Sequence, residues 1–243
     1  MRLTIPCMTC TQELGRLTDT YSNVEMQDDG CYEVTCPRGH TTTTVLQQHK
    51  FEVLLHIGAH AILDGYYREA VSTFASSLER FYEFSIRVLL EASTGSDDLF
   101  EATWKSVARY SERQVGAFVF LWAAHFKTGP SLLSEDRTRF RNDVVHKGKI
   151  PSREQALKYG NDVLGVLVPL MWELKKTFPE QVQNSVARQI KGSLAKAADQ
   201  SKITVMSSGM IVDLSLGERT LPDTSLEEHL ITLKKWKDTF GGA

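Results

Sequence analysis

The sequence predicts a mainly α protein: a helical bundle with a small β domain before it and a short β-hairpin plus one helix after it. Apolar residues recur at spacings of three and four over much of 49–200, which is the period of amphipathic helices. Residues 1–48 are polar, rich in turn residues and contain all four cysteines. Residues 201–243 return to short segments with a final helical pattern. We therefore expect three parts, 1–48, 49–200 and 201–243.

The composition is that of a globular chain, with 42% hydrophobic and 24% charged residues among 243. A net charge of −2 argues against a surface coated with positive charge, although it leaves room for a local basic patch. The apolar runs Val115–Ala124 and Val163–Trp172 are half of the about 20 residues that a membrane helix needs, so they predict buried helices and no membrane partner. The first residues lack the apolar stretch of a signal peptide, and we expect a cytoplasmic location.

The cysteines of the N-terminal part predict a metal site, because clustered cysteines in a reducing compartment favour metal over disulfides. Cys7-x2-Cys10 has the spacing that lets two thiolates meet at one ion, and Cys36-x3-His40 makes a second such pair. Zinc takes four nitrogen or sulfur ligands in a tetrahedron. The first choice of ligands is therefore Cys7, Cys10, Cys36 and His40.

Cys31 is a fifth candidate ligand, and it could replace His40 or pack as a small apolar residue. Four protein ligands leave no open position for water, so we expect a structural zinc ion. A segment of about 48 residues also needs such a metal cross-link to fold alone. With the strand predicted over Gly30–Cys36, the fragment resembles small zinc ribbons in which a strand ends in Cys-Pro-x-Gly-His.

Three helices are predicted in the first half of the bundle, over Phe51–Leu63, Glu69–Leu90 and Phe100–Lys127. The second has one continuous apolar face, and Gly129-Pro130 ends the third. His56, His60 and Asp64 follow the four-residue steps of two-histidine metal sites. Because their neighbours are apolar, these three residues are better explained as polar positions on a helix packing surface than as metal ligands.

A further long helix is predicted after Ser152, which is a suitable N-cap. Pro169 should kink or interrupt it, and Pro179 should separate a helix over Gln181–Ala198. Beyond it, Ile203–Met206 and Met210–Leu216 flank a Ser-Ser-Gly turn and predict a hairpin.

A capping-box pattern over Thr224–Glu227 predicts the start of a last helix, which should extend to about Phe240.

The segment Arg141-Asn142-Asp143-Val144-Val145-His146 carries the side chains that a metal-free ribonuclease needs. Arginine holds phosphate with a planar fork of donors, and histidine exchanges protons near pH 7. Asn142 and His146 are four apart and share one helix face. Arg141 and His146 are roughly 140° apart around a helix, so Arg141 must reach around or the helix must end near His146. Gly148 and Pro151 predict such an end.

Basic residues surround this segment, as RNA binding requires. They are Arg137, Arg139, Arg141, Lys147, Lys149 and Arg153. Arg137 and Lys147 are the candidate substrate contacts. The alternative is a surface helix whose arginine and histidine are solvated or capping.

Arg141–His146 resembles the Arg–polar–x–x–x–His signature of the HEPN family (higher eukaryotes and prokaryotes nucleotide-binding). Gly65–Glu83 is similar to the first long helix of HEPN domains, and the resemblance covers roughly residues 50–175. On that helix Glu79 and Arg80 could point at the same cleft as substrate-binding residues, or form a solvated ion-pair face.

The resemblance implies a helical bundle that dimerises, with two motifs facing each other across the dimer. It implies metal-independent cleavage in which the RNA 2′-OH attacks the adjacent phosphate. His146 would be the general base or acid, Arg141 would stabilise the phosphorane, and Asn142 would orient His146 or contact the phosphate. It further implies a toxin or phage-defence role, with an antitoxin or activating protein as partner.

Two other functions fit the sequence. One is a non-catalytic HEPN-like scaffold that binds a nucleotide or a protein. The other is a zinc-ribbon transcription regulator that uses the helices only to dimerise; the modest net charge speaks against it.

Overall fold

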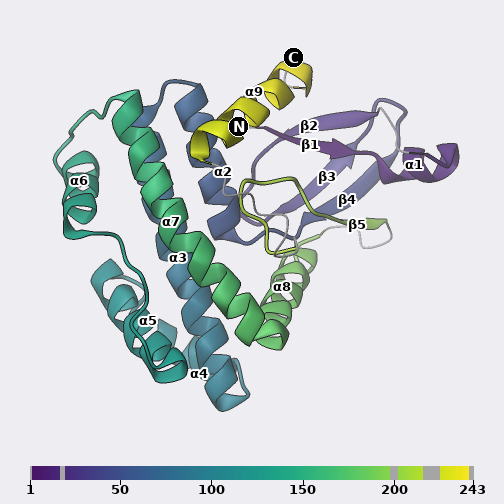
Figure 1. Cartoon of the computed structure of the whole chain (residues 1–243). Coiled ribbons are helices and arrows are strands. Elements are labelled where there is room, and N and C mark those ends of the chain that lie inside the picture. The colour runs from purple at the N-terminus through teal and green to yellow at the C-terminus, as the bar shows by residue number, and fades with distance from the viewer. Residues whose placement is uncertain (1, 17–19, 198–201, 216–224, 241–243) are drawn as a thin grey trace. The chain divides into compact units, whose positions relative to one another are not determined.

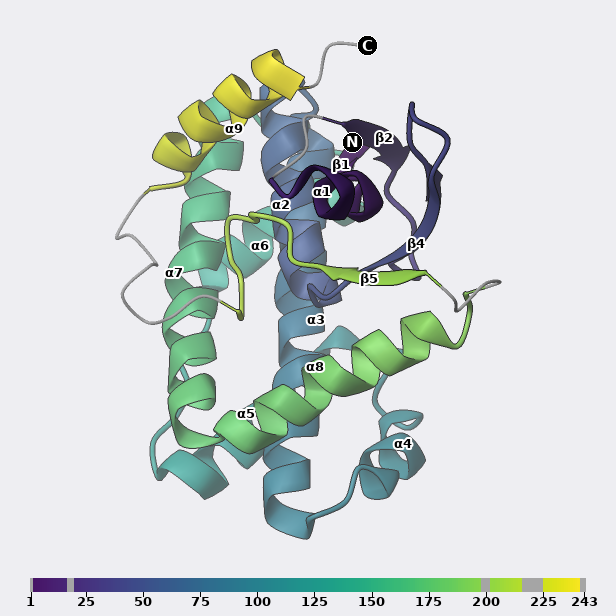
Figure 2. The same cartoon turned by 90° about the vertical axis from the view of Figure 1, so that its right-hand side faces the viewer.

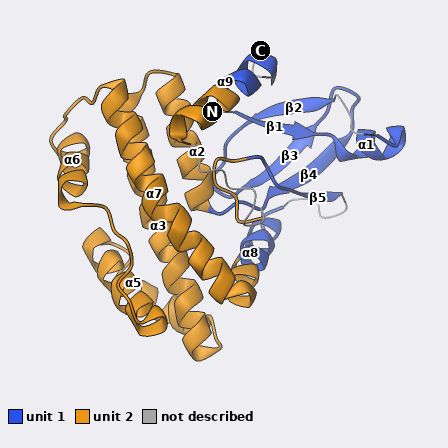
Figure 3. Cartoon of the chain, in the orientation of Figure 1, with its two compact units in different colours: residues 1–49, 186–209, 235–243 blue, residues 50–185, 210–234 orange. Residues whose placement is uncertain are grey.

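The computed structural model describes residues 2–16, 20–197, 202–215 and 225–240, which are mainly helical with small sheets (Figures 1 and 2). The chain divides into two compact units (Figure 3). Unit 1 comprises residues 1–49, 186–209 and 235–243, and unit 2 comprises residues 50–185 and 210–234. The C-terminal part that the sequence sets apart thus contributes to both units.

Unit 1 is built on short strands. Strands β1 (Arg2–Pro6) and β2 (Tyr21–Glu25) pair antiparallel, with helix α1 (Met8–Leu14) between them in the chain. A second sheet has the order β3-β4-β5, where β3 (Cys31–Thr35) and β4 (Thr41–Leu46) are antiparallel. Alternation along β3 buries Tyr32 and Val34, as the pattern over Gly30–Cys36 predicts.

The predicted C-terminal hairpin is wrong. Ile203–Met206 forms β5, but it pairs in parallel with β4, and Met210–Ser215 forms no strand in the described chain. The side chain of Gln48 binds the residues of the predicted Ser-Ser-Gly turn. Its Nε2 donates to Ser207 Oγ (2.8 Å) and to the Ser208 carbonyl (3.0 Å). The predicted turn residues are thus bound by Gln48, and the segment after them, from Met210, belongs to unit 2.

The segment that follows the turn is buried in unit 2. Met210 to Leu214 are each at most 7% exposed. The backbone N–H of Leu214 donates to the buried Glu52 (2.7 Å), and its carbonyl accepts from Lys175. The apolar residues of this segment thus serve burial among the helices of unit 2 rather than strand pairing.

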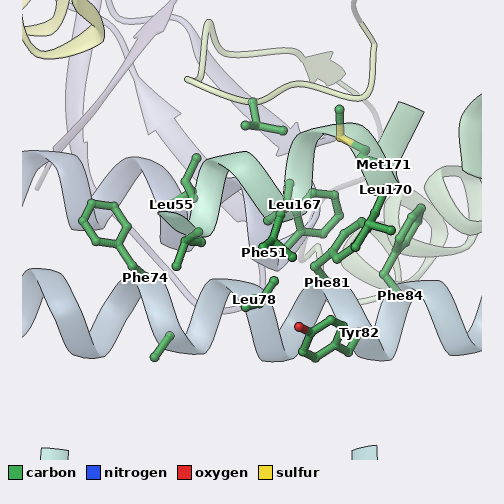
Figure 4. Packing of buried hydrophobic residues seen from close by; sticks show 14 of the residues in the cluster. Phe51, Leu55, Phe74, Leu78, Phe81, Tyr82, Phe84, Leu167, Leu170 and Met171 are labelled. Carbon is green, nitrogen blue, oxygen red and sulfur yellow. The ribbon is translucent and has the colours of Figure 1, made fainter. Parts of the chain in front are cut away.

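Unit 2 is a helical bundle around the long helix α3. Its other helices are α2 (Lys50–Leu63), α4 (Asp98–Trp104), α5 (Ser111–Phe126), α6 (Glu135–His146) and α7 (Arg153–Thr177), together with the first parts of α8 (Pro179–Leu194) and α9 (Leu226–Phe240). Helix α3 (Tyr67–Thr94) packs against α2, α4, α5, α6 and α7. Figure 4 shows its aromatic side chains beside Phe51 and Leu55 of α2 and Leu167 of α7.

Phe74 packs closely against two glycines in this core. Its ring lies against Gly58 of α2 and Gly160 of α7, where an added Cβ would come within 2.6 Å and 2.8 Å of ring carbons. Real Cβ atoms do not approach so closely, so both glycines are needed for this helix spacing.

One helix prediction needs correction. The predicted helix over Phe100–Lys127 is two helices, α4 and α5, although no glycine or proline lies between them. Side chains compensate the broken backbone: Gln114 donates to the Ala108 carbonyl (2.7 Å) and Arg113 to the Ser106 carbonyl (3.1 Å). Of the two effects expected of Pro169, a kink or an interruption, the interruption does not occur: α7 continues across the proline, with buried residues on both sides of it.

The start of α7 confirms the predicted cap. Ser152 Oγ accepts from the Gln155 N–H (3.2 Å), and the Gln155 side chain accepts from the Ser152 N–H (3.0 Å). Thr224, at the other predicted cap, lies outside the described residues. None of the helices in the described ranges is both long and apolar enough to cross a membrane.

Candidate functional site

The first half of the candidate metal centre comes from α1. Cys7 is the N-cap of this helix, and its sulfur accepts a hydrogen bond from the Cys10 N–H (3.5 Å). The two-residue spacing thereby places both sulfurs at the start of one helix. Both side chains are buried.

The second half is the turn after β3. The Gly39 N–H donates to the Cys36 carbonyl (2.8 Å), and the Cys36 N–H donates to the His40 carbonyl (2.9 Å). Gly39 has a φ of +83°, a conformation that glycine adopts without strain. The turn carries the chain back so that His40 faces Cys36.

The four side chains of the first choice, Cys7, Cys10, Cys36 and His40, lie close together and could bind a metal ion such as zinc. Cys10 Sγ is 3.3 Å from His40 Nδ1 and 3.9 Å from Cys36 Sγ, and Cys7 Sγ is 3.8 Å from His40 Nδ1. All four ligand atoms lie within 4.8 Å of one another. A zinc tetrahedron with bonds of about 2.3 Å to sulfur and about 2.0 Å to nitrogen has edges of about 3.5–3.8 Å, so the donor set fits.

Cys31 is not part of this cluster. It lies half-buried at the start of β3, where burial and the nearby Asp29 raise the pKa of its thiol. Within the cluster, burial opposes ionisation of Cys36, but hydrogen bonds with the backbone of His40 and Arg38 lower the pKa of this thiol. A lowered thiol pKa favours the thiolate, which is the form that binds a metal.

One residue of the centre was missed by the sequence analysis. Glu13 Oε1 lies 3.2 Å from His40 Nε2, and Glu13 Oε2 lies 3.1 Å from Arg38 Nη2. Its position three residues after Cys10 on α1 is the sequence feature that could have predicted it.

The candidate active site lies at the end of α6, which carries Arg141, Asn142 and His146 and ends at His146. Arg141 Nη1 donates to Asn142 Oδ1 (2.9 Å), and Nη2 donates to Glu79 of α3. His146 is exposed, and no residue in the described part of the chain hydrogen-bonds to its ring. Gly148, with a φ of +72°, turns the chain away after the helix.

A buried tyrosine packs against α6 near this site. Tyr159 of α7 packs against Phe140 of α6, with ring centroids 5.8 Å apart. Burial raises the pKa of Tyr159, although the charge of Arg141 opposes this and that of Glu79 adds to it. The phenol therefore stays protonated at neutral pH and supplies no base.

The candidate substrate residues differ in their surroundings. Lys147 is exposed and pairs with Asp143 (2.9 Å), whereas Arg137 pairs with Asp162 of α7. The structure brings Glu79 to Arg141. It holds Arg80 elsewhere, with Glu83 and with Gln114 (3.4 Å).

His56 and His60 have ring centroids 5.0 Å apart on α2. The converging metal ligands found in the described ranges are the N-terminal four, and these two histidines are not among them.

No protein-family model, curated protein or solved structure matches this chain. The HEPN resemblance therefore depends only on the residues quoted for it.

Proposed function

We propose that this chain is an endoribonuclease that cleaves RNA without a catalytic metal at the end of α6. The observation that carries the proposal is the combination of Arg141, oriented by Glu79 and Asn142, with an exposed and unpartnered His146 one turn later. Arginine binds and stabilises phosphate charge, and histidine transfers protons at neutral pH. Exposed Lys147 and Lys149 add positive charge at the same end of the helix.

In the proposed reaction, His146 either removes the proton of the RNA 2′-OH or protonates the leaving 5′-oxygen. The 2′-oxygen then bonds to the adjacent phosphorus, and the phosphorus–5′-oxygen bond breaks. The products are a cyclic phosphate and a 5′-hydroxyl. Arg141 stabilises the charge of the five-coordinate phosphorane, and Asn142, on the same helix face as His146, orients the histidine or contacts the phosphate.

The site would be completed by a second copy of the chain, because one protomer offers one histidine and the reaction uses both an acid and a base. A role as a toxin or phage-defence effector, with an antitoxin or an activating protein, belongs to the same proposal. The N-terminal centre would hold a structural zinc ion, since Cys7, Cys10, Cys36 and His40 provide the four ligands that close the coordination sphere.

The test is cleavage of RNA by the purified full chain, with and without EDTA. The wild type should produce discrete fragments with cyclic phosphate ends under both conditions. His146→Ala should lower the rate by at least about 100-fold, the contribution typical of a general acid or base. His125→Ala, a histidine change on α5, is the matched control and should cut like the wild type.

A substrate with a 2′-deoxy nucleotide at the cut site should resist cleavage. Equal cutting of that substrate, or full activity of His146→Ala, would overturn the proposed mechanism.

A second candidate is a non-catalytic scaffold that binds a nucleotide or a protein. The observation that favours it is the engagement of the Arg141 guanidinium by Glu79 and Asn142, which leaves fewer donors for phosphate. A dimeric, zinc-loaded wild type that binds RNA or nucleotide without cutting it would select this function.

A further inference from the structure

We propose that the N-terminal centre binds its metal ion through Nδ1 of His40, and that Glu13 is the positioning residue that selects this nitrogen. This inference depends on the metal centre proposed above and deepens it. The two nitrogens of the His40 ring have different partners. Nδ1 faces Cys10 Sγ at 3.3 Å and Cys7 Sγ at 3.8 Å, whereas Nε2 faces Glu13 Oε1 at 3.2 Å.

The chemistry of these partners fixes the tautomer. A neutral imidazole carries one N–H, and the other nitrogen keeps the lone pair that binds a metal. The Glu13 carboxylate only accepts hydrogen bonds, so the proton belongs on Nε2. The lone pair of Nδ1 is then directed at the sulfur atoms. A carboxylate behind a ligating histidine fixes the ring and makes the metal-binding nitrogen more basic.

The local fold explains why Glu13 can reach the ring. Cys7, Cys10 and Glu13 follow one another at steps of three along α1 and its N-cap, so they occupy neighbouring positions on the helix surface. Gly15, with a φ of +64°, ends the helix directly afterwards. One short helix therefore supplies two sulfur ligands and the partner of a third ligand.

Arg38 binds the other oxygen of the same carboxylate: Arg38 Nη2 lies 3.1 Å from Glu13 Oε2. The carboxylate thus bridges α1 to the turn that carries His40. Glu13 is 45% exposed and Arg38 is 48% exposed, so we expect either substitution to leave the packing of the buried cysteines unchanged. The direct effect of Glu13 should therefore appear in metal affinity.

The first test is cobalt binding by the full chain, followed by thiolate-to-cobalt absorption in competition with a chelator. Glu13→Ala should weaken affinity by about 10–100-fold, the usual effect of losing such a partner. Glu13→Gln should restore part of the affinity, because its amide oxygen still accepts from Nε2. Arg38→Ala is the matched control: it removes the second partner of the carboxylate and should change affinity by less than the glutamate change.

The second test is long-range ¹⁵N NMR of the His40 ring in the zinc-loaded chain, which identifies the coordinated nitrogen directly. We expect a metal on Nδ1 and a proton on Nε2. Coordination through Nε2, or wild-type affinity in Glu13→Ala, would overturn the inference and leave the metal centre standing. A wild type that takes up no cobalt, or cobalt uptake that survives Cys36→Ser unchanged, would overturn the metal centre itself.

Discussion

Acidification should destabilise unit 2 through the buried His56. This side chain of α2 is 7% exposed, its Nδ1 is enclosed, and no described residue hydrogen-bonds to that nitrogen. Burial, followed by the nearby His60 and His229, lowers the pKa of His56 from 6.5 to about 3. A buried polar atom without a partner is rare and costs stability, and a charged form at this position costs more.

The direction of the effect follows from proton binding in the two states. Between pH 6.5 and about 3 the unfolded chain protonates His56 while the folded chain keeps it neutral. The unfolded state therefore binds more protons, and the free energy of unfolding falls as the pH falls through this window. Integrating these two pKa values from neutral pH to about pH 5 gives a loss of about 2 kcal/mol from this residue. Burial also lowers the pKa of His229, although Glu228 opposes this, so that histidine adds a loss in the same direction.

The assay is urea unfolding, followed by far-UV circular dichroism at about pH 8 and about pH 5. His56→Leu replaces the imidazole with an apolar side chain and should lose about 2 kcal/mol less than the wild type on acidification. His146→Ala controls for the loss of one histidine at an exposed position and should keep the wild-type pH dependence. Identical pH dependence in the wild type and His56→Leu would refute the reasoning.

Three further predictions address packing, the metal centre and the candidate active site. Gly160→Ala should lower the free energy of unfolding by about 1–3 kcal/mol, because the new Cβ would lie 2.4 Å and 2.8 Å from neighbouring side-chain carbons. Gly165→Ala on the same helix, where an added Cβ would have nothing within 4 Å, should be neutral or stabilising. Thermal unfolding of the two variants measures the difference. Cys36→Ser should increase hydrogen exchange in β1 to β4 while the helices of unit 2 keep their protection; uniform exchange in both units would contradict an independent metal centre. Glu79→Gln should slow RNA cleavage by at least about tenfold because Arg141 loses its positioning partner, and an unchanged rate would remove Glu79 from the site.

Local periodicity predicted the parts of the fold that depend on neighbours within one or two turns. The apolar spacing along α3, the Ser152 capping box and the two cysteine pairs of the metal centre are each visible within a few turns of sequence. One failure depends on distant partners and the other on local side chains. β5 pairs in parallel with β4, a strand far away in the sequence, and Gln48 binds Ser207 and Ser208 just after β5; no local pattern contains these contacts. The break between α4 and α5 is compensated by side-chain hydrogen bonds between nearby residues, but it lacks the glycine or proline that would have predicted it.

The candidate active site has the same division between local and distant information. The motif places Arg141, Asn142 and His146 on one helix, but whether Arg141 is available to phosphate depends on Glu79, which lies 62 residues earlier on α3. Both side chains are partly exposed, at 20% and 27%, and ion pairs with solvent access contribute about 0–1 kcal/mol. A phosphate offers the guanidinium a bidentate partner of at least that strength, so it can replace the carboxylate. Glu79 either positions Arg141 for phosphate or holds it away from phosphate, and these two roles predict opposite results for Glu79→Gln. If Glu79 positions the arginine, the variant loses cleavage. If Glu79 holds the arginine away from phosphate, the variant gains RNA affinity.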